Sequence, residues 1–136
     1  SIIDDYGHHS TEIATTLKAA REVVKNNKII CVFQPHKYTR LRDLFNEFCH
    51  ALSDADVVIV SDIYSAGQAP IEGINQDTLV RGIEKAGHKN VIKLPSEKDL
   101  AKIIKSRIKS GDMVFFTGAG TITNWAAALE SQLKTV

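Results

Sequence analysis

The chain has 136 residues, of which 43% are hydrophobic, and its formal net charge is +1. This length suits one compact domain with a core of its own, and the near-neutral charge gives no indication of a nucleic-acid partner or an anionic membrane surface. No apolar run in the sequence is long enough for a membrane-spanning helix.

Short apolar runs recur along the chain and predict the strands of a buried sheet. They are Ile2-Ile3, which forms the stub of a strand, followed by 28–34, 56–63, 91–94 and 113–117. The longer runs are rich in β-branched residues and lack polar alternation, as parallel strands do when helices cover both faces of the sheet.

Between these runs, apolar residues recur at the spacing of amphipathic helices. The predicted helices lie at 13–24, 41–52, 79–86, 100–108 and about 122–133. Thr39 is expected to cap the second helix, and Ser96 with Asp99 to form a capping box at the fourth. Cys31 lies in a strand pattern and Cys49 in a helix pattern, which favours free thiols in a reducing compartment.

The alternation of strands and helices predicts an α/β fold: a doubly wound, mostly parallel, Rossmann-like sheet with helices on both faces, in a single domain over residues 1–136. In such folds ligands bind at the carboxyl ends of the strands. The segments at those positions are 4–9, 35–40, 62–67 and 118–121, and they hold most of the chemically reactive side chains. This coincidence is the first argument for a site.

The segment after the run 28–34 gathers positive charge from His36, Lys37 and Arg40 at the start of a predicted helix. A carboxylate or phosphate bound there would be held by these cations and by exposed backbone N–H groups. The alternative is a group of solvated basic residues paired with acids on neighbouring loops. Charge signs at helix ends are a weak preference, so both interpretations stay open.

Residues 4–9 read DDYGHH and follow the first strand. Asp4 or Asp5 could accept hydrogen bonds from the two hydroxyls of a ribose, as acids do in nucleotide sites. His8 and His9 would point to opposite sides of an extended chain, and no further ligand spacing completes a zinc site. A metal site is therefore not expected here.

The turn Gly118-Ala119-Gly120 allows either an N–H nest for a ligand or a plain tight turn. Two classes of function compete for the whole chain. A free-standing, receiver-like regulatory domain that binds a nucleotide or an anion would use Asp62 but needs a lysine where Thr117 stands. A domain that supplies part of a larger enzyme's site is favoured by the abrupt start at Ser1 and by the lack of a phosphate loop.

Several stretches together closely resemble the C-terminal domain of the Mur ligases. They are DDYGHH, VFQPHKYTRLRDL, ALSDADVVIVSDIYSAG, IEGI and TGAG, and the resemblance extends from Ser1 to about Leu133. It implies a third domain, preceded in the whole enzyme by a UDP-binding domain and by a central domain that carries the ATP phosphate loop and the magnesium ligands. The chain alone is then expected to hold no catalytic residue and to be inactive.

The resemblance also implies an activity. Family members that match these stretches use ATP and magnesium to join L-alanine to UDP-N-acetylmuramate through an acyl phosphate, in peptidoglycan synthesis in the bacterial cytoplasm. The implied partners are the two other domains, ATP, L-alanine and UDP-N-acetylmuramate, with no nucleic acid and no membrane.

Residue by residue, the resemblance places Asp5 at the ATP ribose. It places Tyr6, His36, Lys37 and Arg40 around the incoming L-alanine and its carboxylate. His8 and the turn formed by Gly118, Ala119 and Gly120 are implied to lie close to the substrates.

Three positions depart from the family pattern. Ser10 stands where proline is usual, and it can still start the helix as an N-cap. Lys37 stands where arginine is usual, and it keeps the charge but loses the two-pronged hydrogen bonding, which predicts a looser hold on a carboxylate. Gln68 stands where glutamate is usual, and sequence alone does not explain that change.

Overall fold

The computed structural model describes residues 2–5, 9–118 and 120–134. Its centre is a five-stranded sheet in the order β1-β5-β2-β3-β4, and each neighbouring pair of strands is parallel. The strands are β1 (Ile2–Asp5), β2 (Ile29–Phe33), β3 (Val57–Val60), β4 (Val91–Lys93) and β5 (Met113–Thr117). The predicted doubly wound α/β fold is confirmed.

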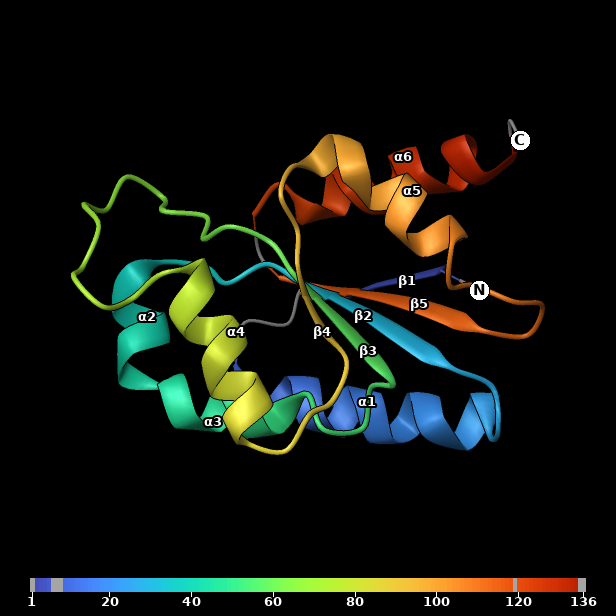
Figure 1. Cartoon of the computed structure of the whole chain (residues 1–136), viewed down its shortest axis with the longest axis horizontal. Helices are drawn as coiled ribbons and strands as arrows, with labels where there is room; N and C mark the ends of the chain where they lie inside the picture. Colours follow the sequence, from blue (N-terminus) through green and yellow to red (C-terminus); the bar gives the residue numbers. More distant parts are fainter. Residues whose placement is uncertain (1, 6–8, 119, 135–136) are drawn as a thin grey trace.

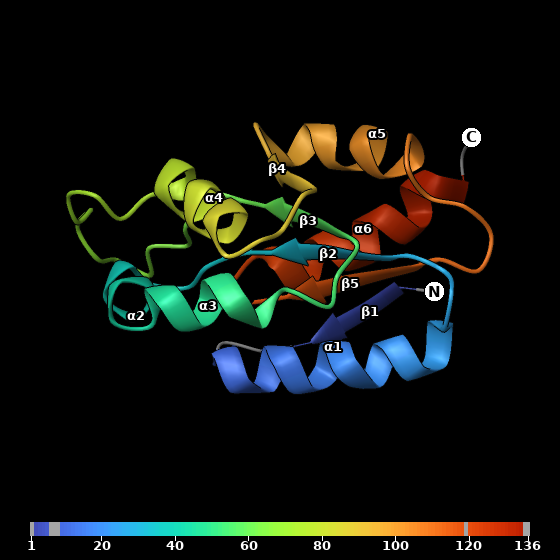
Figure 2. The same cartoon turned by 60° about the horizontal axis from the view of Figure 1, so that its bottom comes forward.

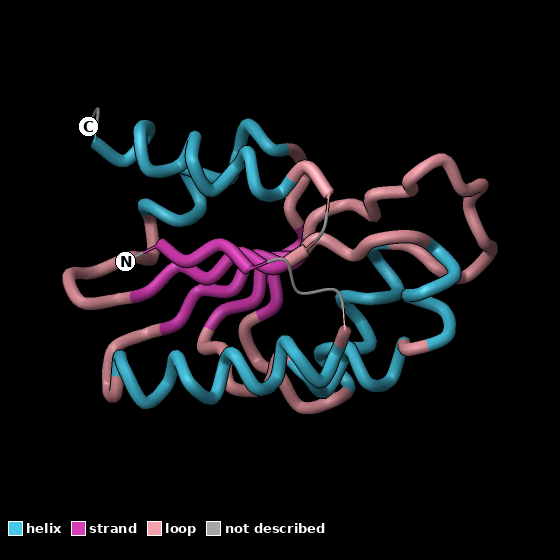
Figure 3. The backbone as a smooth tube through the Cα atoms, turned by 180° about the vertical axis from the view of Figure 1, so that it is seen from behind, coloured by secondary structure: helices cyan, strands magenta, loops and turns pink. Residues whose placement is uncertain are grey.

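Helices cover both faces of the sheet, as Figures 1 and 2 show. The helices are α1 (Ser10–Val24), α2 (Tyr38–Asp43), α3 (Phe45–Ala51), α4 (Gln76–Lys85), the 3₁₀ helix η1 (Glu97–Asp99), α5 (Leu100–Lys105) and α6 (Ile122–Lys134). Helices α1 to α4 lie on one face, and α5 and α6 on the other. Seen from behind, the sheet again lies between the two helical layers (Figure 3).

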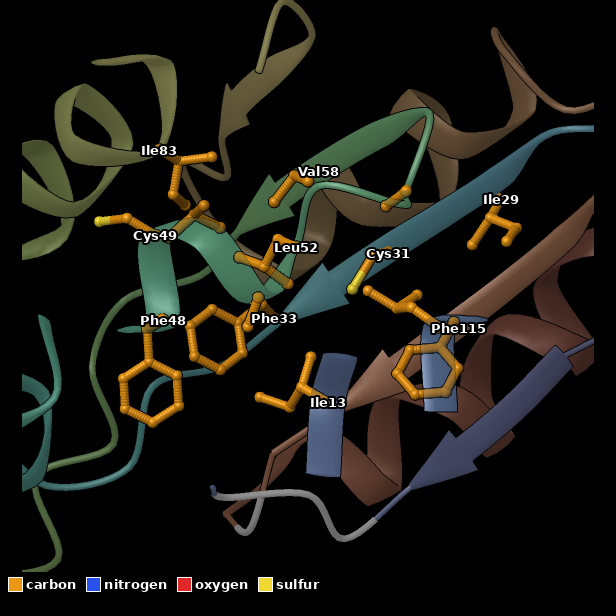
Figure 4. Packing of buried hydrophobic residues seen from close by; sticks show 14 of the residues in the cluster. Ile13, Ile29, Cys31, Phe33, Phe48, Cys49, Leu52, Val58, Ile83 and Phe115 are labelled. Atoms are coloured by element: carbon orange, nitrogen blue, oxygen red, sulfur yellow. The ribbon is translucent and has the colours of Figure 1, made fainter. Parts of the chain in front are cut away.

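The alternation of side chains along the strands divides the interior into two cores. On β2, Ile29, Cys31 and Phe33 join the core beneath α1, α3 and α4, whereas Ile30 and Val32 join the core beneath α5 and α6. All five residues are 0–1% exposed. Figure 4 shows the first core, in which the rings of Phe33 and Phe48 lie 5.4 Å apart. Burial on both faces explains why β2 and β3 are apolar throughout.

Several details of the predicted helices are wrong. The helix expected over 41–52 is two helices, because the chain leaves helical geometry at Leu44, where φ is −118° and ψ is 25°. Thr39 does not cap it: Lys37 is the N-cap and forms no side-chain capping bond. Likewise His9, not Ser10, is the N-cap of α1.

Two other helix starts differ in how far they agree with their sequence signals. Ser96 is the N-cap of η1 as expected, but its hydroxyl accepts from the Lys98 N–H over 3.3 Å, so the capping box predicted for Ser96 and Asp99 does not form. A capping box that the sequence analysis missed joins Asn75 and Thr78 at the start of α4. Among the residues that the structure describes, no helix combines the length and apolar character needed to cross a bilayer.

Candidate functional site at the carboxyl ends of the strands

The parallel register brings the ends of several strands to one edge of the sheet. Thr117, the last residue of β5, is opposite Asp5 of β1 and Phe33 of β2, and Phe33 is opposite Val60 of β3. The segments that follow these strands therefore emerge side by side. This arrangement confirms that the segments after β2, β3 and β5 converge, as the fold rule predicted.

Tyr64, after β3, fixes the segment that follows β2. Its N–H donates to the Pro35 carbonyl and its carbonyl accepts from the Lys37 N–H, both over 2.8 Å. The imidazole of His36 stacks on the Tyr64 ring with centroids 5.5 Å apart and planes inclined by 9°. These contacts hold His36 and Lys37 in place before α2 begins.

Lys37 has a backbone conformation that is unusual for an L-amino acid, with φ 69° and ψ 135°. Such conformations persist where neighbouring contacts determine them, and they gather at functional sites. Here the Tyr64 carbonyl accepts from the Lys37 N–H, and the Lys37 carbonyl accepts from the Leu41 N–H over 3.2 Å. The strain therefore lies where Lys37 turns the chain into α2.

A cleft of about 410 Å³ opens beside the first turn of α2. It is lined by Lys37, Thr39, Arg40, Asp43, Leu44 and Gln68. Asp43 forms an ion pair with Arg42 over 2.9 Å. Among the described residues, Lys37 and Arg40 form no ion pair, so their charges stay available to an anion.

The sequence analysis left open whether these cations are paired with acids on neighbouring loops. Among the described residues, the acid that lines the cleft, Asp43, pairs with Arg42 and not with Lys37 or Arg40, so an anion site at these two cations stays a prediction that this geometry permits. Helix α2 has only six residues. The positive character of the cleft therefore comes chiefly from the side chains of Lys37 and Arg40, and less from a helix dipole.

The turn between β5 and α6 packs directly on the residues described above. Gly118 has φ 152°, and a Cβ atom there would lie 2.9 Å from the Gln34 carbonyl oxygen. A Cβ atom on Gly120 would lie 2.6 Å from Cγ of Tyr64. The glycines thus permit close approach to Gln34 and Tyr64, and Ala119 lies outside the described residues.

Gln34 links this turn to β2, and the sequence analysis assigned it no role. Its side chain is 4% exposed; Nε2 donates to Oγ1 of Thr121 over 3.0 Å, and Oε1 accepts from the Ile122 N–H over 3.1 Å. A polar residue at the end of an otherwise apolar run was the available signal. Gln68, which also lines the cleft, was noted in the sequence only as a departure from the family pattern and without a role.

The remaining predicted residues belong to the segment after β1. Asp5 is the last residue of β1, and its backbone pairs with that of Thr117 at the same sheet edge as the cleft. Tyr6 and His8 lie outside the described residues. Within the described part of the chain, no group of three or more His, Cys, Asp or Glu side chains is arranged to hold a metal ion.

Comparison with known proteins identifies the family. The sequence profile of the Mur ligase, glutamate ligase domain, matches residues 1–120. The chain belongs to the Mur ligase family. It is 58% identical over 134 residues to the UDP-N-acetylmuramate–L-alanine ligase of Bradyrhizobium sp. strain BTAi1, an alignment that covers 98% of this chain and 28% of that relative. The chain therefore spans little more than a quarter of the length of the curated Mur ligase that it matches.

Solved Mur ligase structures share the fold. The UDP-N-acetylmuramate–alanine ligase of Thermotoga maritima superposes with a TM-score of 0.77 at 27% identity, covering 98% of this chain and 26% of that one. A single domain of a putative UDP-N-acetylmuramate:L-alanyl-γ-D-glutamyl-meso-diaminopimelate ligase from Haemophilus ducreyi superposes with a TM-score of 0.69 at 22% identity. That alignment covers 97% of this chain and 89% of the Haemophilus domain.

Proposed function

We propose that this chain is the C-terminal domain of an ATP-dependent ligase that joins L-alanine to UDP-N-acetylmuramate in bacterial peptidoglycan synthesis, in the cytoplasm. The observation that carries the proposal is the 58% identity, over 98% of the chain, to a curated ligase of that name. The free cations of the cleft beside α2 supply the chemistry that a carboxylate-bearing substrate needs.

The proposal divides the work between three domains. Two preceding domains would bind the UDP end of the substrate and the ATP phosphates with their magnesium ion, since this chain covers only 28% of the length of the curated ligase that it matches. This domain would hold the ATP ribose through Asp5, which ends β1 at the ligand-binding edge of the sheet. The ATP site would then lie between domains.

This domain would also hold the amino acid. Arg40 and Lys37, with His36 and Tyr6, would surround the L-alanine carboxylate, and His8 and the turn 118–120 would lie nearby. A carboxylate fixed by charged donors leaves its amine free to attack the acyl phosphate on the partner substrate, with release of phosphate. Closure of this domain over the site would exclude water from the acyl phosphate.

The test is steady-state kinetics of the full-length protein that contains this chain. Arg40→Ala should raise the KM for L-alanine about tenfold or more, because a charged hydrogen bond to the carboxylate is lost, and should change the KM for ATP little. Arg107→Ala is the matched control, because Arg107 is exposed beyond α5 and bonds to Ser106. Equal effects of Arg40→Ala on both KM values would contradict the assigned role.

The same assay tests the activity itself. The full-length protein should release phosphate when UDP-N-acetylmuramate, ATP and L-alanine are all present, and the isolated chain should release none. Turnover by the isolated chain would overturn the division of work between domains. Absence of turnover by the full-length protein with L-alanine, glycine or L-serine would overturn the proposed activity.

A further inference from the structure

Gln68 lies in the long loop between β3 and α4, which extends beyond the sheet beside α2 (Figure 1). Its side-chain amide forms two hydrogen bonds with Thr39. The Thr39 N–H donates to Oε1 of Gln68 over 3.1 Å, and Nε2 of Gln68 donates to Oγ1 of Thr39 over 2.9 Å. One side chain thus holds both the backbone and the hydroxyl group of a residue 29 positions away.

These bonds supply what the start of α2 lacks. The side chain of the N-cap residue Lys37 forms no hydrogen bond to the first turn of α2. The backbone N–H groups of that turn therefore need an acceptor from another part of the chain. Gln68 provides that acceptor across the cleft. Arg40 follows Thr39 directly, so the turn that Gln68 fixes is the turn that carries Arg40.

The loop presents Gln68 in a fixed position. The Gln68 N–H donates to the Ser65 carbonyl over 3.0 Å, which closes a turn whose central residues, Ala66 and Gly67, have φ 52° and 86°. Just before this turn, Tyr64 hydrogen-bonds to Pro35 and Lys37. The loop is therefore attached to the segment 35–39 at Tyr64 and at Gln68.

The charge of the side chain at this position matters as much as its geometry. Gln68 is neutral and lines the same cleft as Lys37 and Arg40. A glutamate could still accept hydrogen bonds from the Thr39 N–H and hydroxyl groups. It would, however, place a carboxylate beside the two cations, where it would compete with a substrate carboxylate.

We propose that Gln68 is a positioning and affinity-setting residue: its amide orders the turn that carries Arg40 without cancelling the positive charge that holds the amino-acid carboxylate. This inference rests on the proposed function.

The test compares Gln68→Glu and Gln68→Ala in the full-length protein by measuring kcat, both KM values and the melting temperature. Gln68→Glu should raise the KM for L-alanine about threefold to fivefold, with an unchanged KM for ATP and melting temperature, since it preserves the bonds to Thr39. The increase should shrink at high salt, because salt screens exposed charges. Gln68→Ala should raise the KM for L-alanine and lower the melting temperature.

Asp43→Asn provides a test of opposite sign, because it removes the acid that lines the cleft and pairs with Arg42. It should lower the KM for L-alanine and, combined with Gln68→Glu, return it towards the wild-type value. Gln132→Glu, on an exposed position of α6, is the charge-matched control and should change neither KM.

The outcomes separate this inference from the proposed function. An active wild-type enzyme whose KM for L-alanine is unchanged by both Gln68→Glu and Asp43→Asn would overturn the role of Gln68 alone. A Gln68→Glu variant with equal increases in both KM values would do the same, since the damage would then be general. A wild-type protein without ligase activity would overturn the proposed function and this inference with it.

Discussion

Two residues beside the cleft, Lys37 and Ala66, have positive φ angles that L-amino acids adopt reluctantly: 69° and 52°. Both belong to the backbone that Tyr64 and Gln68 join together. Replacing Lys37 by glycine, which would relieve its backbone conformation, would also remove its charge. Ala66 has no such constraint, so the energetic contribution of backbone conformation can be measured there without altering the cations.

The turn around Ala66 allows a test with opposite signs at adjacent residues. Ala66→Gly should raise the free energy of unfolding by about 0.5–1 kcal/mol, because glycine adopts positive φ without a steric penalty. Gly67→Ala should lower the free energy of unfolding by about 1 kcal/mol, because alanine adopts the positive φ of this position at a cost. No steric clash contributes, since no atom lies within 4 Å of the added Cβ. Urea unfolding checks both, and changes of the same sign would contradict the interpretation.

Sequence reasoning found the two cations of the cleft, Lys37 and Arg40, but neither Asp43 nor the residues that hold the cations in place. His36, Lys37 and Arg40 follow an apolar run directly, so the fold rule placed them at the ligand-binding edge of the sheet. Gln68 acts through hydrogen bonds to Thr39, from another loop. No local pattern marks such a contact, because it depends on how two distant turns fold.

Among the elements, α2 and α3 show how far apolar spacing can predict a helix. The spacing continues through Leu44, and the Phe48 N–H still donates to the Leu44 carbonyl over 2.9 Å, so a single helix was a reasonable prediction. The break at Leu44 has no glycine or proline to signal it. It makes α2 a separate short helix, and the cleft is lined along α2 by Arg40, Asp43 and Leu44.

The turn between β5 and α6 is the second element of the site, and Gln34 is the side chain that fixes it. Gln34→Leu should lower the free energy of unfolding by about 2–3 kcal/mol, because the buried Ile122 N–H loses its acceptor. Thr121→Val removes one partner of the same amide and should cost about 0.5–1 kcal/mol. Urea denaturation of the two variants measures both losses. Equal losses would mean that the hydrogen bond from the Ile122 N–H to Gln34 does not contribute to the free energy of unfolding.

At the scale of the whole molecule, strand identity was predictable and strand order was not. Apolar runs revealed β2, β3 and β5 because both faces of the sheet are buried along these strands. For the same reason the apolar sequence of a strand does not indicate which strands lie next to it. The sequence therefore could not place β5 between β1 and β2. That placement brings Thr117 between Asp5 and Phe33, and so unites the segments that form the site.

The two cysteines differ in burial, so their reactivity can show which parts of the fold open to solvent. Both belong to the core beneath α1, α3 and α4. Cys31 is 0% exposed on the central strand β2, and burial raises the pKa of its thiol far above the usual range. Cys49 is 5% exposed and lines a cavity of about 420 Å³ between α3 and α4, and burial raises the pKa of its thiol to about 11.

Thiol labelling of the isolated chain should therefore modify Cys49 from the native state and Cys31 only after global unfolding. The thiolate reacts, so below its pKa the rate rises tenfold per pH unit. The labelling rate of Cys49 should keep rising up to about pH 11, whereas that of an ordinary thiol levels off near about pH 8.5. Iodoacetamide labelling followed by mass spectrometry measures both sites, and Cys49→Ser should leave only the slow modification. A plateau near pH 8.5 would instead mean that Cys49 reacts after α3 and α4 separate, and that this side of the sheet opens independently of β2.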